Sequence, residues 1–162
     1  MSVALVPGTY DPITLGHIDV IERSAQIFTH IIVGVAASAQ KGSGPLFTVA
    51  ERVAFVADGV AHLPNVEVVP FSKLLVDFAS EVKANAIVKG LRAVTDFESE
   101  FQQASLNYHL NPELETVFIM ATPQYMYLSS SMVKEIAILN GNISDWVTPR
   151  VQRALETKLT AL

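Results

Sequence analysis

The sequence contains no cysteine, which excludes disulfide bonds, thiolate nucleophiles and zinc sites built on cysteine. It has no apolar run near the ~18 residues that a membrane-spanning helix needs. Its first residues also lack the basic stretch with which a secretory signal begins. We therefore expect a cytoplasmic protein that has no membrane partner.

Basic residues are scarce. Lys and Arg together number 11 against 16 Asp and Glu, so the formal net charge is −5. A protein that binds duplex nucleic acid needs a basic surface, and this composition disfavours such a partner. If the protein handles small anions, its few cations must be gathered at one place.

Two common phosphate-binding motifs are also missing. No G-x-G-x-x-G follows a strand-like run, and no G-x-x-x-x-G-K-[ST] occurs anywhere. The sequence shows no Ser-His-Asp arrangement and no carboxylate pair, and His30, His62 and His109 lack the spacing of metal ligands. We expect no metal site formed by the protein itself.

What remains is typical of a globular enzyme or binding domain. The chain has 162 residues, half of them hydrophobic, and a mean hydropathy of +0.35. This length predicts one domain over residues 1–162. The high hydropathy indicates that copies of the chain cover part of its surface.

Five short runs rich in β-branched residues read as strands. They are continuous and do not alternate with polar residues, as expected for strands buried on both faces of a parallel sheet. The runs cover residues 2–6, 31–35, 66–69, 86–88 and 116–120.

Helical stripes lie between and after these runs, with apolar residues three or four positions apart. The stripes cover residues 15–28, 49–60, 74–82, 97–108, 132–139 and 151–159. This alternation predicts an α/β fold: a single-domain, doubly wound (Rossmann-like) five-stranded parallel sheet with helices on both faces. Such sheets bind ligands at the carboxyl ends of their strands.

The segment after the first strand favours anion binding. Gly8 allows a sharp turn, and Thr14 is placed to cap the following helix. Gly16 and His17 then fall in the first helical turn, where unpaired N–H groups attract phosphate. The alternative is that Gly16 is a packing glycine and His17 a surface residue.

Three further segments carry candidate phosphate ligands. Lys41 lies in a glycine-containing loop, and Lys89 and Arg92 flank Gly90 after the fourth strand. After the fifth strand come three serines at 129–131, which either cap a helix or offer hydroxyl and N–H groups to a phosphate. Lys134 either assists them or is solvated.

Residues 8–17 and 128–134 resemble the T/HxGH and I-S-S-S/T-x-x-K/R signatures of the nucleotidyltransferase superfamily. With Lys89-Gly90-Leu91-Arg92 and Asp96-Phe97-Glu98 added, the sequence resembles the phosphopantetheine adenylyltransferase family. The motifs occur in the family's order and span nearly the whole chain.

This resemblance implies transfer of AMP from ATP to 4′-phosphopantetheine, giving 3′-dephospho-coenzyme A and pyrophosphate in coenzyme A biosynthesis. It further implies Mg²⁺ carried by ATP, a homohexamer and a cytoplasmic location. A phosphate is already an ionised nucleophile at pH 7, so this chemistry needs positioned donors and no general base.

The resemblance also assigns residues. Catalytic roles fall to His17, Thr9, Lys41 and Arg92, and binding of the phosphopantetheine substrate falls to Thr9, Lys41, Leu75 and Lys89. The nucleotide site comprises Thr9, Tyr10, His17, Gly90, Leu91, Arg92, Glu100, Tyr125, Met126, Tyr127, Leu128, Ser129, Ser130 and Ser131.

Three alternatives remain at this stage. The first is another adenylyl- or cytidylyltransferase, acting for example on nicotinamide mononucleotide or glycerol phosphate. The second is a nucleotide-binding module without catalytic activity. The third is a flavodoxin-like electron carrier, which the paired cations Lys89 and Arg92 disfavour.

Overall fold

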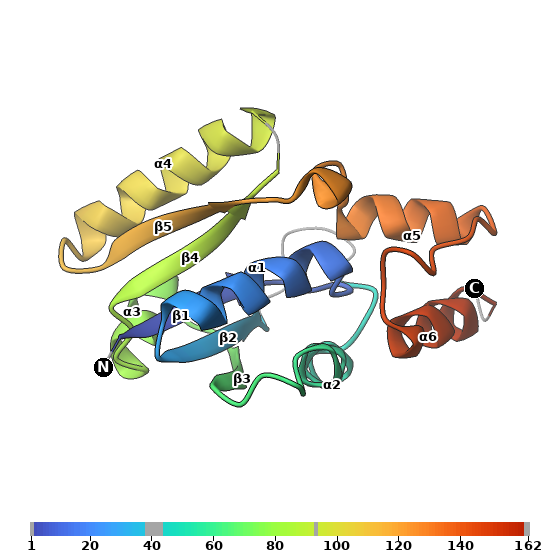
Figure 1. Ribbon diagram of the computed structural model, residues 1–162, viewed down its shortest axis with the longest axis horizontal. Coiled ribbons are helices and arrows are strands. Elements are labelled where there is room, and N and C mark those ends of the chain that lie inside the picture. The colour runs from blue at the N-terminus through green and yellow to red at the C-terminus, as the bar shows by residue number, and fades with distance from the viewer. Residues whose placement is uncertain (1, 38–43, 93, 161–162) are drawn as a thin grey trace.

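A computed structural model describes residues 2–37, 44–92 and 94–160, of which 94–96 by their backbone alone. In this part of the chain, strands and helices alternate along most of the sequence (Figure 1). The strands are β1 (Val3–Gly8), β2 (His30–Ala36), β3 (Val66–Phe71), β4 (Ala86–Leu91) and β5 (Glu115–Met120). The helices are α1 (Leu15–Ile27), α2 (Val49–Gly59), α3 (Leu75–Glu81), α4 (Val94–Leu110), α5 (Ser130–Ile138) and α6 (Pro149–Thr160), with a 3₁₀ turn at Pro123–Tyr125.

The five strands form one parallel sheet in the order β3-β2-β1-β4-β5. This confirms the predicted α/β fold with a five-stranded, doubly wound sheet. Each predicted run lies mostly inside an observed strand, because residues buried on both faces of a sheet must be apolar throughout. Thr14 caps α1 as expected, accepting a hydrogen bond from the backbone of His17.

The fourth strand is longer than its apolar run. We expected Lys89, Gly90 and Leu91 to follow this strand, but they belong to it and pair with residues 118–120 of β5. Backbone pairing with a neighbouring strand extends β4 past its apolar residues. Gly90 also lies against α1, since a Cβ atom there would be 3.0 Å from Cγ2 of Val20.

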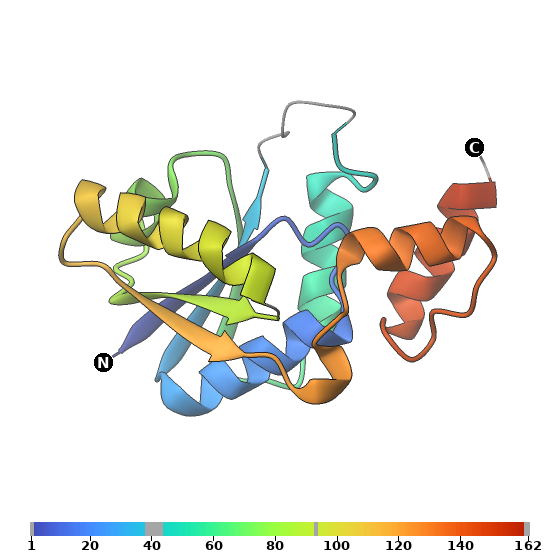
Figure 2. The ribbon, with the colours of Figure 1, turned by 90° about the horizontal axis from the view of Figure 1, so that it is seen from above.

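Helices cover both faces of the sheet. Side chains of α1, α2, α5 and α6 join one core cluster with alternate residues of the strands, and α3 packs with Leu5, Ile32 and Ile87 in a second cluster. Figure 2 shows α3 and α4 on one side of the sheet and α1 on the other. No helix in the described part of the chain is both long and apolar enough to cross a membrane.

The apolar stripe of α4 is not buried in the single chain. Phe97, Phe101 and Tyr108 are about half exposed, at 48%, 56% and 56%. Phe97 stacks on Phe101 with ring centroids 5.8 Å apart and contacts Phe118 of β5 at 6.3 Å. The stripe predicted the helix correctly but not a buried face.

The strand order reverses beside β1, whose neighbours are β2 on one side and β4 on the other. The register between β1 and β4 ends at the pair Leu5 and Ile87, whereas β1 and β2 pair as far as Gly8. The two central strands therefore separate toward their carboxyl ends. This is the point at which doubly wound sheets bind their ligands.

Candidate active site

A cleft opens between the carboxyl ends of β1 and β4. It is lined by residues 6–8 and 88–90 from these strands and by residues at the start of α1. The side chains that enclose it include His17, Arg92, Glu100, Tyr125 and Leu128. The cleft therefore collects residues from four segments that are distant in the sequence.

His17 is held at the start of α1 by a reciprocal capping interaction. The Thr14 side chain accepts from the His17 backbone N–H, while Nδ1 of His17 lies 3.0 Å from the backbone nitrogen of Thr14. A backbone N–H can only donate, so Nδ1 is the acceptor. In the neutral ring the proton is then on Nε2, and His17 can offer this N–H to a ligand in the cleft.

The charge state of His17 suits this role. Burial, together with the nearby cations Arg92 and Lys89, lowers the pKa of His17 from 6.5 to about 4. The imidazole is therefore neutral at physiological pH. It is a hydrogen-bond donor and not a fixed positive charge.

Tyr10 forms the inner wall beside His17. Its side chain is only 4% exposed, its φ is 50°, and its hydroxyl donates to the carbonyl of Val6 at 3.0 Å. The two rings meet edge to face, with centroids 5.2 Å apart. Burial raises the pKa of Tyr10 well above its ordinary value, so this phenol stays protonated. Tyr10 shapes the cleft and does not act as a base.

Two cations, Lys89 and Arg92, also line the cleft. Nζ of Lys89 lies 3.2 Å from Oε2 of Glu100 on α4. Nη1 of Arg92 donates to the carbonyl of Leu128 at 2.8 Å and so joins the end of β4 to the segment before α5. A basic side and a neutral donor face one cavity, an arrangement suited to an anionic ligand.

Two of the three serines at 129–131 make contacts that serve the local structure. Ser129 caps α5 by accepting from the Met132 N–H, and the Ser130 hydroxyl donates to the carbonyl of Pro12 at 2.7 Å. Ser131 is exposed. The capping interpretation is therefore confirmed for Ser129, and Ser130 ties α5 to the segment before α1.

Some of the expected site residues lie apart from the cleft walls. Thr9 is exposed at its rim, Met126 is half buried, and Tyr127 is 78% exposed. Leu91 is buried at the end of β4. Leu75, the first residue of α3, is partly buried and packs against the second core cluster. Lys41 lies outside the described residues.

Gly16 has a packing role. A Cβ atom at this position would be 3.3 Å from Cβ of Tyr125 and 3.6 Å from a methyl carbon of Leu128. The space that its missing side chain leaves is therefore occupied by the segment before α5. Gly16 also lines the cleft, so the approach of a ligand phosphate to its backbone stays a prediction.

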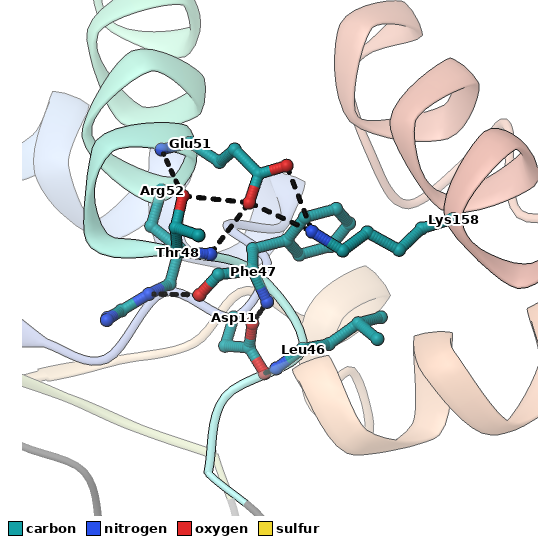
Figure 3. A network of polar contacts seen from close by, with 7 residues as sticks. All are labelled: Asp11, Leu46, Phe47, Thr48, Glu51, Arg52 and Lys158. Atoms are coloured by element: carbon teal, nitrogen blue, oxygen red, sulfur yellow. Dashed lines mark hydrogen bonds and ion pairs between the residues drawn. The ribbon is translucent and has the colours of Figure 1, made fainter. Parts of the chain in front are cut away.

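Sequence reasoning missed a buried polar network behind the cleft (Figure 3). Asp11 accepts hydrogen bonds from the backbone N–H groups of Leu46 and Phe47, both at 2.9 Å, and an ion pair from Lys134 at 2.7 Å. Burial alone would raise the pKa of Asp11, but Lys134 and the two N–H groups lower it below its ordinary value. Lys134, for which we had left two roles open, thus pairs with Asp11.

Arg52 belongs to the same network and was also missed. Its place on the apolar face of α2, three residues after Val49 and four before Val56, was the available signal. Among the described residues, no group of three or more His, Asp or Glu side chains is arranged to hold a metal ion.

Several solved structures share this fold. A Vibrio parahaemolyticus protein assigned as a nicotinate-nucleotide adenylyltransferase matches with a TM-score of 0.69 and 19% identity, over 96% of this chain and 99% of its own. A bifunctional NMN adenylyltransferase/ADP ribose pyrophosphatase from Francisella tularensis gives 0.70 and 15%, over 98% of this chain and 49% of its own. The lipopolysaccharide core biosynthesis protein from Thermoplasma volcanium gives 0.58 and 23%, over 75% and 98%.

At these identities the likeness shows a shared fold and nothing more. The family membership of the chain comes from a match to a sequence profile. The profile of the cytidylyltransferase-like family matches residues 5–136. The match runs from β1 into α5 and so includes the described segments that form the cleft. Members of this family transfer a nucleotidyl group, which agrees with a cleft built for anions. The chain belongs to the cytidylyltransferase-like family of nucleotidyltransferases.

Proposed function

We propose that this protein is a pantetheine-phosphate adenylyltransferase, which transfers AMP from MgATP to 4′-phosphopantetheine and releases pyrophosphate. The observation that carries the proposal is the convergence of His17, Lys89 and Arg92 on one cleft at the switch point of the sheet. Mg²⁺ would enter as part of the nucleotide substrate.

The chemistry follows from these groups. An oxygen of the acceptor phosphate attacks the α-phosphorus of ATP, the bond from that phosphorus to the bridging oxygen breaks, and pyrophosphate leaves. No proton has to be removed from the nucleophile. The task of the protein is to align two anions and to stabilise charge on the α-phosphoryl oxygens.

Each cleft group supplies part of this task. His17 donates its Nε2 hydrogen to an α-phosphoryl oxygen, next to the positive end of α1. Arg92 and Lys89 offset the repulsion between acceptor phosphate and triphosphate. An incoming anion competes with Glu100 for Lys89, whose ion pair spans 3.2 Å.

The choice of acceptor rests on sequence motifs. The order of the segments at 8–17, 89–92, 96–98 and 128–134 resembles the phosphopantetheine adenylyltransferases. In that family, positions matching Thr9, Lys41, Leu75 and Lys89 hold the acceptor. Two of the three related structures are named for acceptors that are nicotinate or nicotinamide mononucleotides. A mononucleotide acceptor is therefore the second candidate.

A pyrophosphate-release assay tests the proposal. ATP and CTP are each combined with 4′-phosphopantetheine, nicotinamide mononucleotide, nicotinate mononucleotide and glycerol phosphate. We expect turnover with ATP and 4′-phosphopantetheine to exceed every other pair by at least about a hundredfold. Faster turnover with a mononucleotide would establish the second candidate. ATP binding without turnover for any acceptor would indicate a binding module.

We also propose that the protein assembles into a homo-oligomer, as the resemblance to a hexameric family implies. The accessible surface of one chain is 9087 Å², against roughly 7,900 Å² for a compact monomer of 17.6 kDa. Part of the excess is apolar, including Phe101, Leu106 and Leu110 on α4. Light scattering after size-exclusion chromatography should give six times the chain mass, and a monomeric mass would contradict the proposal.

A further inference from the structure

Arg52 is a buried cation that binds backbone and does not line the cleft. It is 1% exposed and extends from the first turn of α2 toward the carboxyl edge of the sheet. Its Nε donates to the carbonyl of Phe47 at 3.1 Å, as Figure 3 shows. Its Nη1 donates to the carbonyls of Thr9 at 2.6 Å and Ala36 at 2.8 Å.

The three carbonyls belong to three separate segments. Thr9 follows β1, Ala36 ends β2, and Phe47 precedes α2. The N–H of Phe47 in turn donates to Asp11 at 2.9 Å, so this residue is held from both sides (Figure 3). One planar guanidinium thus fixes the relative positions of the segments that leave β1 and β2. A lysine, with one nitrogen, cannot reproduce this fork.

The Thr9 carbonyl links Arg52 to the cleft. Thr9 lies between Gly8 and Tyr10, both of which line the cavity. The backbone of Tyr10 has a φ of 50°, a conformation that residues other than glycine rarely adopt. The ring of Tyr10 in turn contacts that of His17. A shift of the Thr9 peptide would therefore move the wall against which His17 packs.

Burial of a guanidinium is costly, which argues against a role in mere space filling. An apolar side chain would fill the same volume without that cost. We propose that Arg52 is a positioning residue for the transfer reaction: through the Thr9 carbonyl it holds the turn at residues 8–10 in the geometry that places His17. This inference rests on the proposed function of the cleft.

The test compares Arg52→Lys with Glu51→Ala in the full-length protein. Glu51 is the residue before Arg52 on α2. Its substitution removes part of a helix cap and an ion pair to Lys158 but leaves the hydrogen bond from Arg52 to the Thr9 carbonyl in place. Both variants lose stability, so the pair separates positioning from destabilisation. We expect Arg52→Lys to lower kcat at least about tenfold, with the KM for ATP changed less than threefold, because misplacement affects the reacting geometry. Glu51→Ala should retain its kcat.

A second readout does not depend on the acceptor. The amide signals of Tyr10 and Ala37 belong to the peptide groups whose carbonyls bind Arg52, and we expect both to shift in the ¹H–¹⁵N spectrum of Arg52→Lys. They should stay in place in Glu51→Ala. Shifted signals together with an unchanged kcat per folded molecule would overturn the proposal, and so would unshifted signals.

Two further outcomes are decisive. If Arg52→Lys does not fold, Arg52→Gln is measured in its place, and failure of both to fold shows a purely structural residue and overturns the proposal. Wild-type protein that binds ATP but turns over no acceptor overturns the proposed function and with it this role. An active wild type with a fully active Arg52→Lys overturns only the role of Arg52.

Discussion

The backbone N–H of Thr14 donates a hydrogen bond to Nδ1 of His17 over 3.0 Å, and this bond selects the tautomer of the ring. The Thr14 hydroxyl lies 2.9 Å from the same nitrogen. Both contacts come from the cap of α1, so the local structure that starts the helix also aims the Nε2 hydrogen at the cleft. Formation of the helix cap therefore also fixes which ring nitrogen of His17 carries the proton.

The first prediction concerns this donor. We expect His17→Ala to lower kcat by about 10²–10³, equivalent to about 3–4 kcal/mol, with little change in ATP affinity. Steady-state pyrophosphate release and calorimetric titration with ATP measure the two quantities. His30→Ala is the control, because His30 lies at the opposite end of β2 beside Glu67. Wild-type turnover in His17→Ala would show that His17 has no part in the reaction.

The second prediction concerns the dependence of stability on pH. Burial, followed by Arg92 and Lys89, lowers the pKa of His17 from 6.5 to about 4. Between these two values the unfolded chain binds the proton and the folded chain does not. The free energy of unfolding therefore falls as the pH drops from 6.5 toward 4 and is unaffected by His17 at higher pH.

Denaturant titrations from pH 8 to pH 4.5 measure this effect in the wild type and in His17→Gln. The glutamine variant cannot take up that proton. Its stability should decline less steeply than that of the wild type below pH 6.5. Parallel curves for the two proteins would mean that His17 titrates at its ordinary pKa in the folded state.

How much of this structure follows from sequence depends on the range of the contacts. The five strands and the cap at Thr14 were predictable, because each depends on neighbouring residues. A buried strand appears as a continuous apolar run, and a helix cap appears as a Thr just before the helix. The end of β4 was not: Lys89 and Gly90 are not part of an apolar run, and their strand conformation depends on pairing with β5.

The polar network shows the same limit. The spacing of Arg52 from Val49 and Val56 places it on the buried face of α2, yet two of its acceptors are 43 and 16 residues away. Residue patterns near Arg52 in the sequence cannot predict which distant carbonyls its guanidinium binds. The stripe at Phe97 and Phe101 likewise predicts an amphipathic helix, but whether the chain or a second copy covers it is not encoded in periodicity.

The third prediction concerns the pair of Asp11 and Lys134. The carboxylate is 6% exposed and the ammonium 27%. Breaking a fully buried ion pair costs about 3–5 kcal/mol, and water reaching Lys134 reduces this, so we expect Lys134→Met to lose about 2 kcal/mol. Asp11→Asn should lose a similar amount, because Leu46 and Phe47 donate to different oxygens of Asp11 and an amide NH₂ group would replace one of these acceptors.

The double variant provides the control. Once Lys134 is gone, loss of the Asp11 charge removes an unpaired buried carboxylate, so the two losses should sum to more than the double variant shows. We expect a coupling free energy of about 1 kcal/mol from urea unfolding. Strict additivity would mean that the contact at 2.7 Å contributes nothing to stability.

The fourth prediction compares two glycines that face equally short contacts. A Cβ atom on Gly8 would lie 2.8 Å from Cζ of Tyr10, and one on Gly59 would lie 2.9 Å from Cδ1 of Ile18. The Ile18 atom is the end of a flexible side chain and can rotate away. The Tyr10 ring is planar, buried and hydrogen-bonded to Val6, so it must move as a whole.

We therefore expect Gly8→Ala to lose about 1–3 kcal/mol of stability, as overpacked sites do. Its turnover should fall as well, since Tyr10 packs against His17 with ring centroids 5.2 Å apart. Gly59→Ala should stay within about 1 kcal/mol of the wild type, because alanine favours the helix that ends there. Thermal unfolding and pyrophosphate release measure both variants. Equal stability and activity in the two would show that Tyr10 does not hold the cleft in shape.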